Sequence, residues 1–311
     1  MKHDRDFEPN YGDATEVVPG IRRLTADNSG PFTFYGTNTY LLGTRRLVCV
    51  DPGPASPAHI DAILRAAAGA TIEAILVSHT HVDHSPGARL LKAQTGAPIV
   101  GCGPHRPARA LARNEVNPLD ASGDKDHVPD RMLIDGELFQ APELALETVA
   151  TPGHTANHLC FAVCGAPVLL SADHVMGWST SVVAPPDGSM RDYMASIDKL
   201  LGRKEHTYLP GHGGIIRDAL PYVRNLRRHR LARENAILAQ LDEREKSIPE
   251  LVGALYAEID PALHPAAAMS VFAHLEDLAE RKRVIAQPGL ALDATYRLER
   301  SVESDQDVRP V

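Results

Sequence analysis

The sequence contains Ser78-His79-Thr80-His81-Val82-Asp83-His84, and this stretch decides the fold. It follows the short apolar run 74–77, whose composition is typical of a buried strand. Pro86 and the helical pattern 88–94 come next, and Gly96 closes that pattern. The stretch therefore lies on a strand-to-helix loop, at the strand end where open α/β sheets place their chemistry.

The polar side chains of this loop are of types that bind zinc. His79 and His81 are two residues apart, so they point to the same side of an extended backbone. Asp83 and His84 are adjacent and must diverge, which suits a second metal better than a fourth ligand on the first. One histidine is more often structural than a ligand, but three histidines and an aspartate within six residues favour a metal site.

Three further candidate ligands lie where predicted strands end. His154 follows a strand directly, Asp173 ends the apolar run 168–172, and His212 lies in a glycine-containing loop. We expect all three to converge with the first loop on one edge of a sandwich. Five histidines and two aspartates divide into two sets of three and one bridging carboxylate. Such a division suits a dinuclear hydrolytic site with open positions for water and substrate.

Composition and charge limit the classes of function. The chain has 311 residues, of which 43% are hydrophobic and 23% charged, as in ordinary globular proteins. Its formal net charge of −8 argues against a surface built to bind nucleic acid. We expect neither a membrane span nor a signal peptide. The cysteines Cys49, Cys102, Cys160 and Cys164 show no disulfide framework, so the prediction is a cytoplasmic protein.

The order of the predicted elements indicates the architecture. Strands alternate with helices but also form hairpins, which predicts a mixed-sheet α/β sandwich. A glycine-containing loop carries Phe32, Phe34 and Tyr35, which either line a substrate pocket or anchor the loop on the core. After residue 217 the composition changes to long helical patterns.

The series His79-x-His81-x-Asp83-His84, taken with the three later candidates, resembles the metallo-β-lactamase superfamily. The resemblance covers residues from about 20 to 217 and implies an αββα sandwich. It also implies the ligands of each metal: His79, His81 and His154 on one, Asp83, His84 and His212 on the other, and Asp173 between them. A bridging aspartate fits the hydrolase branch that holds two Zn²⁺ ions, with iron or manganese as alternatives. His174, directly after Asp173, has no role in this pattern.

Finer details resemble the beta-lactamase-like protein 2 group of this superfamily. They are the stretches 36–41, 51–53 and 151–155 and a C-terminal winged-helix domain. The predicted domains are a catalytic domain 1–217, a linker helix 218–240, a winged-helix-like, α-rich domain 241–300 and a polar tail 301–311.

The predicted winged-helix-like domain is acidic. Residues 241–300 contain seven Lys and Arg against eleven Asp and Glu, a net charge of −4. A module that reads DNA normally has the opposite sign. We therefore expect no DNA binding and interpret the domain as a packing or dimerisation element, which would make the protein a homodimer.

The chemistry expected of the metal site is hydrolysis. Two metals would share a bridging water and lower its pKa, so that a bridging hydroxide attacks the substrate at neutral pH. Asp83 is both a candidate ligand and the residue expected to orient the hydroxide or pass a proton. Asp51 and His158 are expected to fix the imidazoles from behind. The alternatives are a turn-capping role for Asp51 and a purely structural hydrogen bond for His158.

The leading hypothesis for function is a dinuclear zinc hydrolase that acts on a small ester, thioester, lactone or related carbonyl substrate. The resemblance implies an alternative, cleavage of single-stranded RNA. The arginine-rich stretch 224–233 supports that alternative, while the acidic charge and the few aromatic residues weigh against it. An iron-dependent oxygenase and a non-catalytic regulatory module are two further interpretations. We expect a small-molecule substrate, which the sequence does not name.

Overall fold

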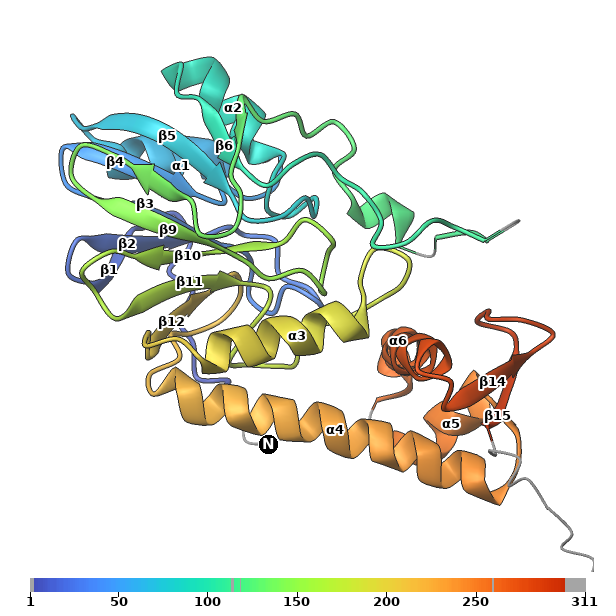
Figure 1. Cartoon of the computed structure of the whole chain (residues 1–311). Helices are drawn as coiled ribbons and strands as arrows, with labels where there is room; N and C mark the ends of the chain where they lie inside the picture. Colours follow the sequence, from blue (N-terminus) through green and yellow to red (C-terminus); the bar gives the residue numbers. More distant parts are fainter. Residues whose placement is uncertain (1–2, 113–114, 118, 259, 300–311) are drawn as a thin grey trace, which may run out of the picture. The chain divides into compact units, whose positions relative to one another are not determined.

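The computed structural model describes residues 3–112, 115–117, 119–258 and 260–299. The chain divides into two compact units between Arg230 and Leu231 (Figure 1). This division falls inside the predicted linker helix 218–240. The polar tail predicted for 301–311 lies outside the described residues. Among the described helices, none combines the length and the apolar composition that crossing a membrane requires.

The first unit contains a seven-stranded sheet. Its strands, in spatial order, are β1 (Thr15–Val18), β2 (Ile21–Thr25), β3 (Asn38–Leu42), β4 (Arg46–Val50), β5 (Thr71–Val77), β6 (Ile99–Gly101) and β7 (Arg131–Met132). The strands from β1 to β4 pair antiparallel, and those from β4 to β7 pair in parallel. Strand β5 is buried along most of its length, as expected for a parallel strand that is covered on both faces.

The second sheet of this unit has five strands. In spatial order they are β12 (Thr207–Pro210), β11 (Val168–Ala172), β10 (Leu159–Val163), β9 (Ala145–Ala150) and β8 (Leu138–Gln140). Neighbouring strands pair antiparallel except β11 and β12. These two are parallel, because helix α3 (Met190–Leu201) connects them as a crossover.

The two sheets share one core. It includes Leu76 of the first sheet and Phe161 of the second, both fully buried. Helices α1 (Pro57–Ala67) and α2 (Gly87–Thr95) lie on one side of the paired sheets (Figure 1). Helix α3 and the beginning of α4 (Ala219–Glu243) lie on the other side. The predicted αββα sandwich is confirmed.

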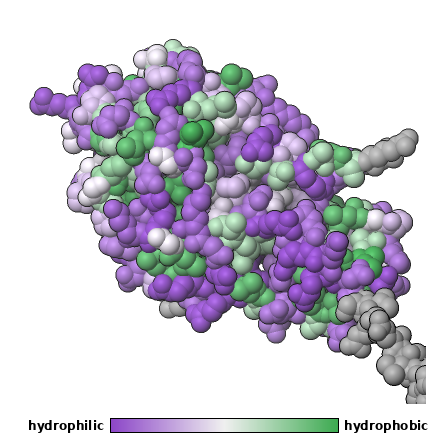
Figure 2. All heavy atoms as spheres, in the orientation of Figure 1, coloured by the Kyte–Doolittle hydropathy of each residue, from purple (hydrophilic) through white to green (hydrophobic). Residues whose placement is uncertain are grey.

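The face of the molecule in Figure 2 is mainly hydrophilic among the described residues. On the face seen in Figure 2, hydrophobic residues form small groups between charged and polar ones. Scattered apolar residues of this kind are ordinary on a globular protein and need no partner to explain them.

Local sequence explains where the helices begin and end. Ser56 caps α1 by accepting a hydrogen bond from the His59 backbone N–H at 3.3 Å, and Pro57 occupies the first turn. Gly96 ends α2 in the left-handed conformation, with φ at 73°. Helix α3 is not predicted from the sequence. Ser189 caps it, and its buried residues recur at helical spacing.

The loops that carry the candidate ligands leave the two sheets at the same edge. Strand β5 leads into the loop 78–84, and β9 is followed by the loop of His154. Strand β11 ends just before Asp173, and β12 ends just before His212. A backbone bridge between Thr37 and His212 joins this edge to the start of β3. The topology therefore brings together residues that are far apart in the sequence.

The second unit has a separate core. Besides the end of α4, it contains α5 (Ile248–Leu255), α6 (His264–Glu280) and a sheet in the order β13 (Lys246–Ser247), β15 (Thr295–Leu298), β14 (Val284–Gln287). Leu251, Phe272 and Tyr296 are buried in its core. Two short 3-10 helices complete the described elements, η1 (Asp120–Ser122) in the first unit and η2 (Pro261–Leu263) in the second. The predicted winged-helix domain is confirmed.

Glu143 joins the turns of the two sheets. It lies in the β8–β9 loop, and its carboxylate accepts hydrogen bonds from the Thr44, Arg45 and Arg46 N–H groups of the β3–β4 turn, at 2.7, 3.0 and 3.0 Å. The Thr44 hydroxyl donates a fourth hydrogen bond at 2.9 Å. These donors lower the pKa of Glu143 to about 2, from an ordinary value of 4.5.

We expect Glu143→Gln to lower the melting temperature at neutral pH, because an amide offers one acceptor oxygen to four donors. The carboxylate favours the folded state fully above a pH of about 5. That contribution is lost as the pH falls through 4.5 toward about 2, where the group becomes protonated in the folded state too. Melting curves recorded from neutral pH downward should therefore show that the difference in melting temperature between wild type and variant becomes smaller. The control is Asp61→Asn, which changes an exposed carboxylate of α1. A difference in melting temperature between wild type and Glu143→Gln that stays constant with pH would contradict this role of Glu143.

Candidate metal centre

The seven candidate ligands predicted from the sequence lie together at one edge of the sandwich. Their nitrogen and oxygen atoms form two groups, and the atoms of each group lie within 4.8 Å of one another. The first group is His79, His81, His154 and Asp173, and the second is Asp83, His84 and His212. Among the described residues a further group, Asp51 with His79 and His84, shares one histidine with each.

Three imidazoles face one another in the first group. His154 Nε2 lies 3.0 Å from His81 Nδ1, and His79 Nε2 lies 3.2 Å from the same nitrogen. The rings meet edge to face, with centroids 4.8, 5.1 and 4.6 Å apart. Three ring nitrogens therefore point at one small volume.

The second group is arranged around the Asp83 carboxylate. Asp83 Oδ2 lies 3.2 Å from His212 Nε2 and 3.4 Å from His84 Nε2. The two Nε2 atoms are themselves 3.3 Å apart. Both histidines are fully buried, so these polar atoms face one another away from water.

Asp173 lies between the two groups. Its Oδ2 is 3.6 Å from His154 Nε2 and 3.3 Å from His212 Nε2, and its Oδ1 is 3.4 Å from His84 Nε2. Oδ1 is buried and accepts no hydrogen bond from the described residues. A buried carboxylate oxygen without a donor calls for a cation beside it. The position is the one that a bridging carboxylate requires.

Hydrogen bonds on the outer side of the rings orient the imidazoles. His154 Nδ1 donates to the Val182 carbonyl at 2.6 Å, and His212 Nδ1 donates to the Gly36 carbonyl at 3.1 Å. Because a carbonyl can only accept, this hydrogen-bond network assigns the proton to Nδ1 in each ring. In the neutral form of each ring, Nε2 therefore presents a lone pair to the centre, as a metal ligand must.

Asp51 orients two more imidazoles through hydrogen bonds on the side of the rings that faces away from the centre. Its Oδ2 accepts hydrogen bonds from Ser78 Oγ at 2.6 Å and from His84 Nδ1 at 3.1 Å. Its Oδ1 accepts from the Ser78 backbone N–H at 2.7 Å. Since Ser78 Oγ donates to Asp51, it accepts in turn from His79 Nδ1, which lies 2.9 Å away. One buried carboxylate thus turns a ring of each group toward the centre.

His158 and His174 lie beside the centre. His158 Nε2 accepts from the Asp173 backbone N–H at 3.2 Å, and its Nδ1 lies 2.9 Å from Thr151 Oγ1. It therefore supports the backbone of Asp173 and contacts no candidate imidazole through a hydrogen bond. His174 packs on the Tyr193 ring at 4.6 Å between centroids, and its nitrogens have no hydrogen-bond partner among the described residues. Burial lowers the pKa of His174 to about 3, so it is a neutral packing residue.

Charge differs between the two groups. Burial and the neighbouring histidines lower the pKa of His81 to about 3, so the first group offers neutral imidazoles. Burial also acts on His212, but the charges of Asp173 and Asp83 outweigh it and raise the pKa of His212 to about 10. The two carboxylates therefore favour a second proton on His212, which a metal ion bound at this group would displace.

The donor set fits two divalent metal ions. Neutral imidazole nitrogens and carboxylate oxygens are the ligands that zinc prefers. Cations between them would satisfy both the ring nitrogens that face one another at 3.0–3.3 Å and Oδ1 of Asp173, which accepts no hydrogen bond from the described residues. Which residue holds which ion stays a prediction, as does the identity of the metal.

A cavity of about 240 Å³ opens over the candidate ligands. Five of them line it: His81, Asp83, His154, Asp173 and His212. Most of its other walls are apolar and come from Phe32, Val82, Leu119, Met176, Val182 and Ala184. A substrate in this cavity would have its reacting group at the polar floor and an apolar group against the walls.

The aromatic loop contributes both to the cavity and to the core. Phe32 is 55% exposed and lines the cavity. Phe34 instead stacks on Trp178 with centroids 4.8 Å apart, and Tyr35 stacks on Phe7 at 6.1 Å. Both roles that the sequence left open are therefore present, in different residues of the loop.

Two residues that hold the centre are not predicted from the sequence. Thr37 Oγ1 donates a hydrogen bond to Asp83 Oδ2 at 3.1 Å. The Asn38 side chain donates to two carbonyls of the loop that carries His212, at 3.0 and 2.9 Å. Both residues lie in the stretch 36–41, which in the sequence indicates the family but no role at the centre.

Comparison with protein families covers both units. Residues 32–212 match the Metallo-beta-lactamase superfamily, and residues 247–289 match the Beta-lactamase associated winged helix domain. The chain belongs to the metallo-beta-lactamase superfamily. It is a hydrolase, and its superfamily implies divalent metal ions at the cluster described above.

Curated relatives cover most of this superfamily member. It is 30% identical over 296 residues to the Lactamase-like protein aptB of Emericella nidulans, across 91% of this chain and 88% of that protein. It is 30% identical to a Beta-lactamase-like protein 2 homolog of Drosophila melanogaster, across 86% of this chain and 93% of that protein. It is 27% identical to the Atrochrysone carboxyl ACP thioesterase of Claviceps purpurea, across 83% of this chain and 79% of that protein. The predicted resemblance to the beta-lactamase-like protein 2 group is confirmed.

A solved structure shows the same fold across both units of this metallo-beta-lactamase superfamily chain. It is a Beta-lactamase domain protein from Burkholderia ambifaria, with a TM-score of 0.77 and 23% identity. The likeness covers 94% of this chain and 95% of that one. At this identity it supports the fold alone.

Proposed function

We propose that this hydrolase cleaves thioesters of small acyl groups, with two zinc ions at the candidate metal centre. The observation that carries the proposal is the cavity of about 240 Å³ with mostly apolar walls directly over the candidate ligands. It offers an acyl group a place beside the reacting centre. Further support comes from a relative that is named a thioesterase and is similar over most of its length. Other small esters and lactones would use the same geometry.

The side chains of the centre divide the work of binding the ions. His79, His81 and His154 would hold one ion, Asp83, His84 and His212 the other, and Asp173 both. When bound, the two ions supply a Lewis acid for the carbonyl oxygen and a water of lowered pKa. The chain supplies the orientation of the lone pairs, through outer hydrogen bonds such as that of His84 to Asp51.

Asp83 is the residue to which we assign proton transfer. Its contacts with the described residues fall on Oδ2, which accepts the hydrogen bond from Thr37 at 3.1 Å. Oδ1 is then available to accept a hydrogen bond from the attacking water and to take its proton. The oxygen of that water forms a bond to the acyl carbon and the C–S bond breaks. Asp83 passes the proton to the leaving sulfur, so the products are a carboxylic acid and a thiol.

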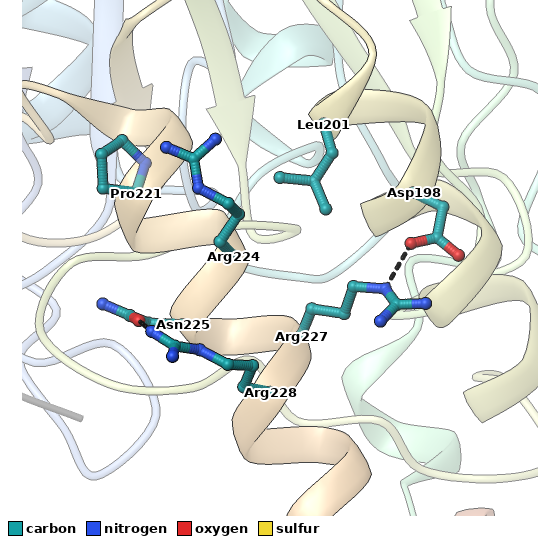
Figure 3. Close-up of a pocket in the computed structure, with 7 residues that line it drawn as sticks. All are labelled: Asp198, Leu201, Pro221, Arg224, Asn225, Arg227 and Arg228. Atoms are coloured by element: carbon teal, nitrogen blue, oxygen red, sulfur yellow. Dashed lines mark hydrogen bonds and ion pairs between the residues drawn. The ribbon is translucent and has the colours of Figure 1, made fainter.

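The arginine-rich helix bears on the alternative function, cleavage of single-stranded RNA. A groove of about 790 Å³ is lined by Asp198, Leu201, Pro221, Arg224, Asn225, Arg227 and Arg228. Figure 3 shows these side chains. Arg227 Nε pairs with Asp198 at 2.6 Å. Arg230 is buried over the Tyr193 ring, with 5.1 Å between the guanidinium carbon and the ring centroid. Arg228 also donates to Asn225 on the same helix, and Arg233 donates to the Leu255 carbonyl at 2.9 Å. A role in phosphate binding would therefore rest on Arg224 and Arg228, whose side chains are exposed.

One substrate panel separates the two functions. We expect the purified protein to hydrolyse acyl thioesters and to leave single-stranded RNA uncut. The double variant Arg224→Gln with Arg228→Gln should keep thioester turnover within about twofold, because neither side chain lines the cavity over the candidate ligands. Turnover of each substrate is measured at several salt concentrations.

The charge-matched control is Arg45→Gln with Arg65→Gln, which changes two exposed arginines outside the groove. RNA cleavage that falls steeply with salt, persists in the control and disappears in the Arg224 and Arg228 variant would establish the nuclease instead. Each lost phosphate contact would then lower the salt slope by roughly one unit.

The proposal also covers the role of the winged helix and the cellular location of the protein. The winged helix carries a net negative charge, so we expect it to pack or dimerise and to bind no DNA. The described chain holds free cysteines, of which Cys49, Cys102 and Cys160 are buried. Free thiols are usual in a reducing compartment, which supports a cytoplasmic location.

A further inference from the structure

Asp187 places a charge on the wall of a cavity whose walls are otherwise mostly apolar. Its side chain is only 7% exposed. Among the described residues it belongs to none of the groups that could hold a metal ion, and the hydrolytic step described above does not use it. Burying a carboxylate is costly unless both oxygens are paired, so this residue needs partners.

One oxygen of Asp187 is already paired within the chain. Asn117 Nδ2 donates to Oδ2 at 2.9 Å, and His105 Nε2 lies 3.7 Å from the same oxygen. The hydrogen bonds that the described residues make to this carboxylate all end on Oδ2. The carboxylate therefore keeps one acceptor, Oδ1, for a molecule that occupies the cavity.

A chain of polar contacts connects Asp187 to the loop of the candidate ligands. His105 Nδ1 lies 3.0 Å from the Thr80 hydroxyl, and Asn157 Nδ2 donates to that hydroxyl at 2.9 Å. Gly123 leaves the His105 ring little room to move, because a Cβ at that glycine would lie 2.5 Å from the ring. Since Thr80 lies between two candidate ligands in the sequence, the position of Asp187 is tied to that of the metal centre.

The backbone around Asp187 is held equally firmly. The Pro186 carbonyl accepts a hydrogen bond from the Ala108 N–H at 2.8 Å. Gly188 packs so closely on the loop that carries His154 that a Cβ at position 188 would lie 2.7 Å from the Gly153 carbonyl oxygen. The carboxylate is therefore preorganised, which is what a binding group requires if it is to lose little freedom when a ligand arrives.

We propose that Asp187 forms a subsite that selects acyl groups carrying a hydrogen-bond donor, a hydroxyl or an amino group. This inference rests on the proposed thioester hydrolysis and adds the chemical class of the acyl group. The class is an apolar body that fits against the cavity walls, with one donor that reaches Asp187 Oδ1. A purely apolar acyl group would cover this charged oxygen and leave it without a partner, so it would bind less well.

Paired substrates test the subsite. The benzoyl thioester of a short thiol is compared with its 2-, 3- and 4-hydroxy and its 2-, 3- and 4-amino derivatives. We expect wild-type protein to prefer at least one derivative by about tenfold or more in kcat/KM, the size of effect that a hydrogen bond to a charged acceptor gives. The ring position of the preferred derivative shows how far from the thioester a donor must lie to contact Asp187. Comparison of the two series shows whether a hydroxyl or an amino group is preferred.

Asp187→Asn should remove this preference and leave turnover of the unsubstituted benzoyl thioester within about threefold. The amide oxygen can still pair with Asn117, but the NH₂ group then faces the donor of the substrate. Asp192→Asn, five positions further on and outside the cavity lining, is the matched control and should keep the preference. Asp187→Ser serves as a second variant if the amide disturbs the loop, which melting curves would reveal.

Binding of the free acids gives a second measurement that does not depend on turnover. Calorimetry should show wild type binding a hydroxy- or aminobenzoate about tenfold more tightly than benzoate, and the Asp187 variants binding them equally. Wild type that hydrolyses thioesters but does not distinguish the derivatives, or a variant that keeps the preference, would overturn the subsite and leave the proposed function intact. If no thioester is hydrolysed, the proposed function fails, and the calorimetry alone decides the subsite: equal binding of all acids by wild type would overturn it.

Discussion

Replacing Asp173 with alanine should empty both metal positions at once. Wild-type protein purified without added metal should contain about two equivalents per chain, mainly zinc, whereas Asp173→Ala should contain under about half an equivalent. The reason is geometric, because the oxygens of Asp173 lie 3.3–3.6 Å from nitrogens of both groups of candidate ligands. Loss of a residue that only orients a ligand already costs about 10- to 100-fold in metal affinity. A shared ligand should cost more at each position, and thioester turnover should fall at least about a thousandfold.

Variants of one group at a time make this result specific. His154→Ala and His212→Ala each remove a ligand from a single group, so each should lose mainly one equivalent of metal. Asp198→Asn changes an exposed carboxylate on α3 and should keep both. Elemental analysis of the wild type and all four variants, purified side by side, gives the answer. A full equivalent retained by Asp173→Ala would remove its bridging role, and a single iron without zinc in wild type would support an oxygenase.

Much of the centre could be predicted because its signals are local. The loop 78–84 follows a short apolar strand, and the period of an extended backbone places His79 and His81 on the same side. The later candidates could be located because each follows the end of a strand. A sandwich then brings these strand ends to one edge, which is a property of the fold class and not of any one segment.

Contacts between distant segments could not be predicted in this way. Thr37 donates to Asp83 across 46 positions of sequence, and Asn117 donates to Asp187 across 70. Such pairs depend on how the strands register and how the loops close, which no local pattern encodes. Their side chains, a threonine and an asparagine, are also common in loops for ordinary turn-forming reasons, so composition does not single them out.

The arginine-rich stretch shows the opposite difficulty. In the sequence it forms one run of positive charge, which supports binding to phosphate. In the structure its members separate according to the face of the helix on which they lie. Arg230 is buried, and its guanidinium group donates to the Ser181 carbonyl, while Arg224 is exposed. A run of like charges predicts a surface only where each member points outward.

Asp83→Asn should lower kcat on a thioester by about 10²- to 10⁴-fold while most of the metal stays bound. The amide keeps an oxygen that can still contact an ion, but it cannot take a proton from water. The neighbouring ligands His84 and His212 remain, each oriented by its outer hydrogen bond, to Asp51 and to the Gly36 carbonyl respectively. Activity and metal content are measured on the same samples, so that a loss of rate can be separated from a loss of metal.

Thr37→Val completes this comparison, because it removes the hydroxyl that donates to Asp83 Oδ2 and leaves the carboxylate in place. Asp83 can then still take the proton but is less firmly oriented, so we expect a loss of about tenfold in kcat with little change in metal content. The order of activity should be wild type, then Thr37→Val, then Asp83→Asn. If Asp83→Asn instead loses activity in proportion to its metal, Asp83 acts as a ligand alone. Thr37→Val should then retain nearly full activity per bound metal, because a ligand that need not move a proton requires less exact orientation.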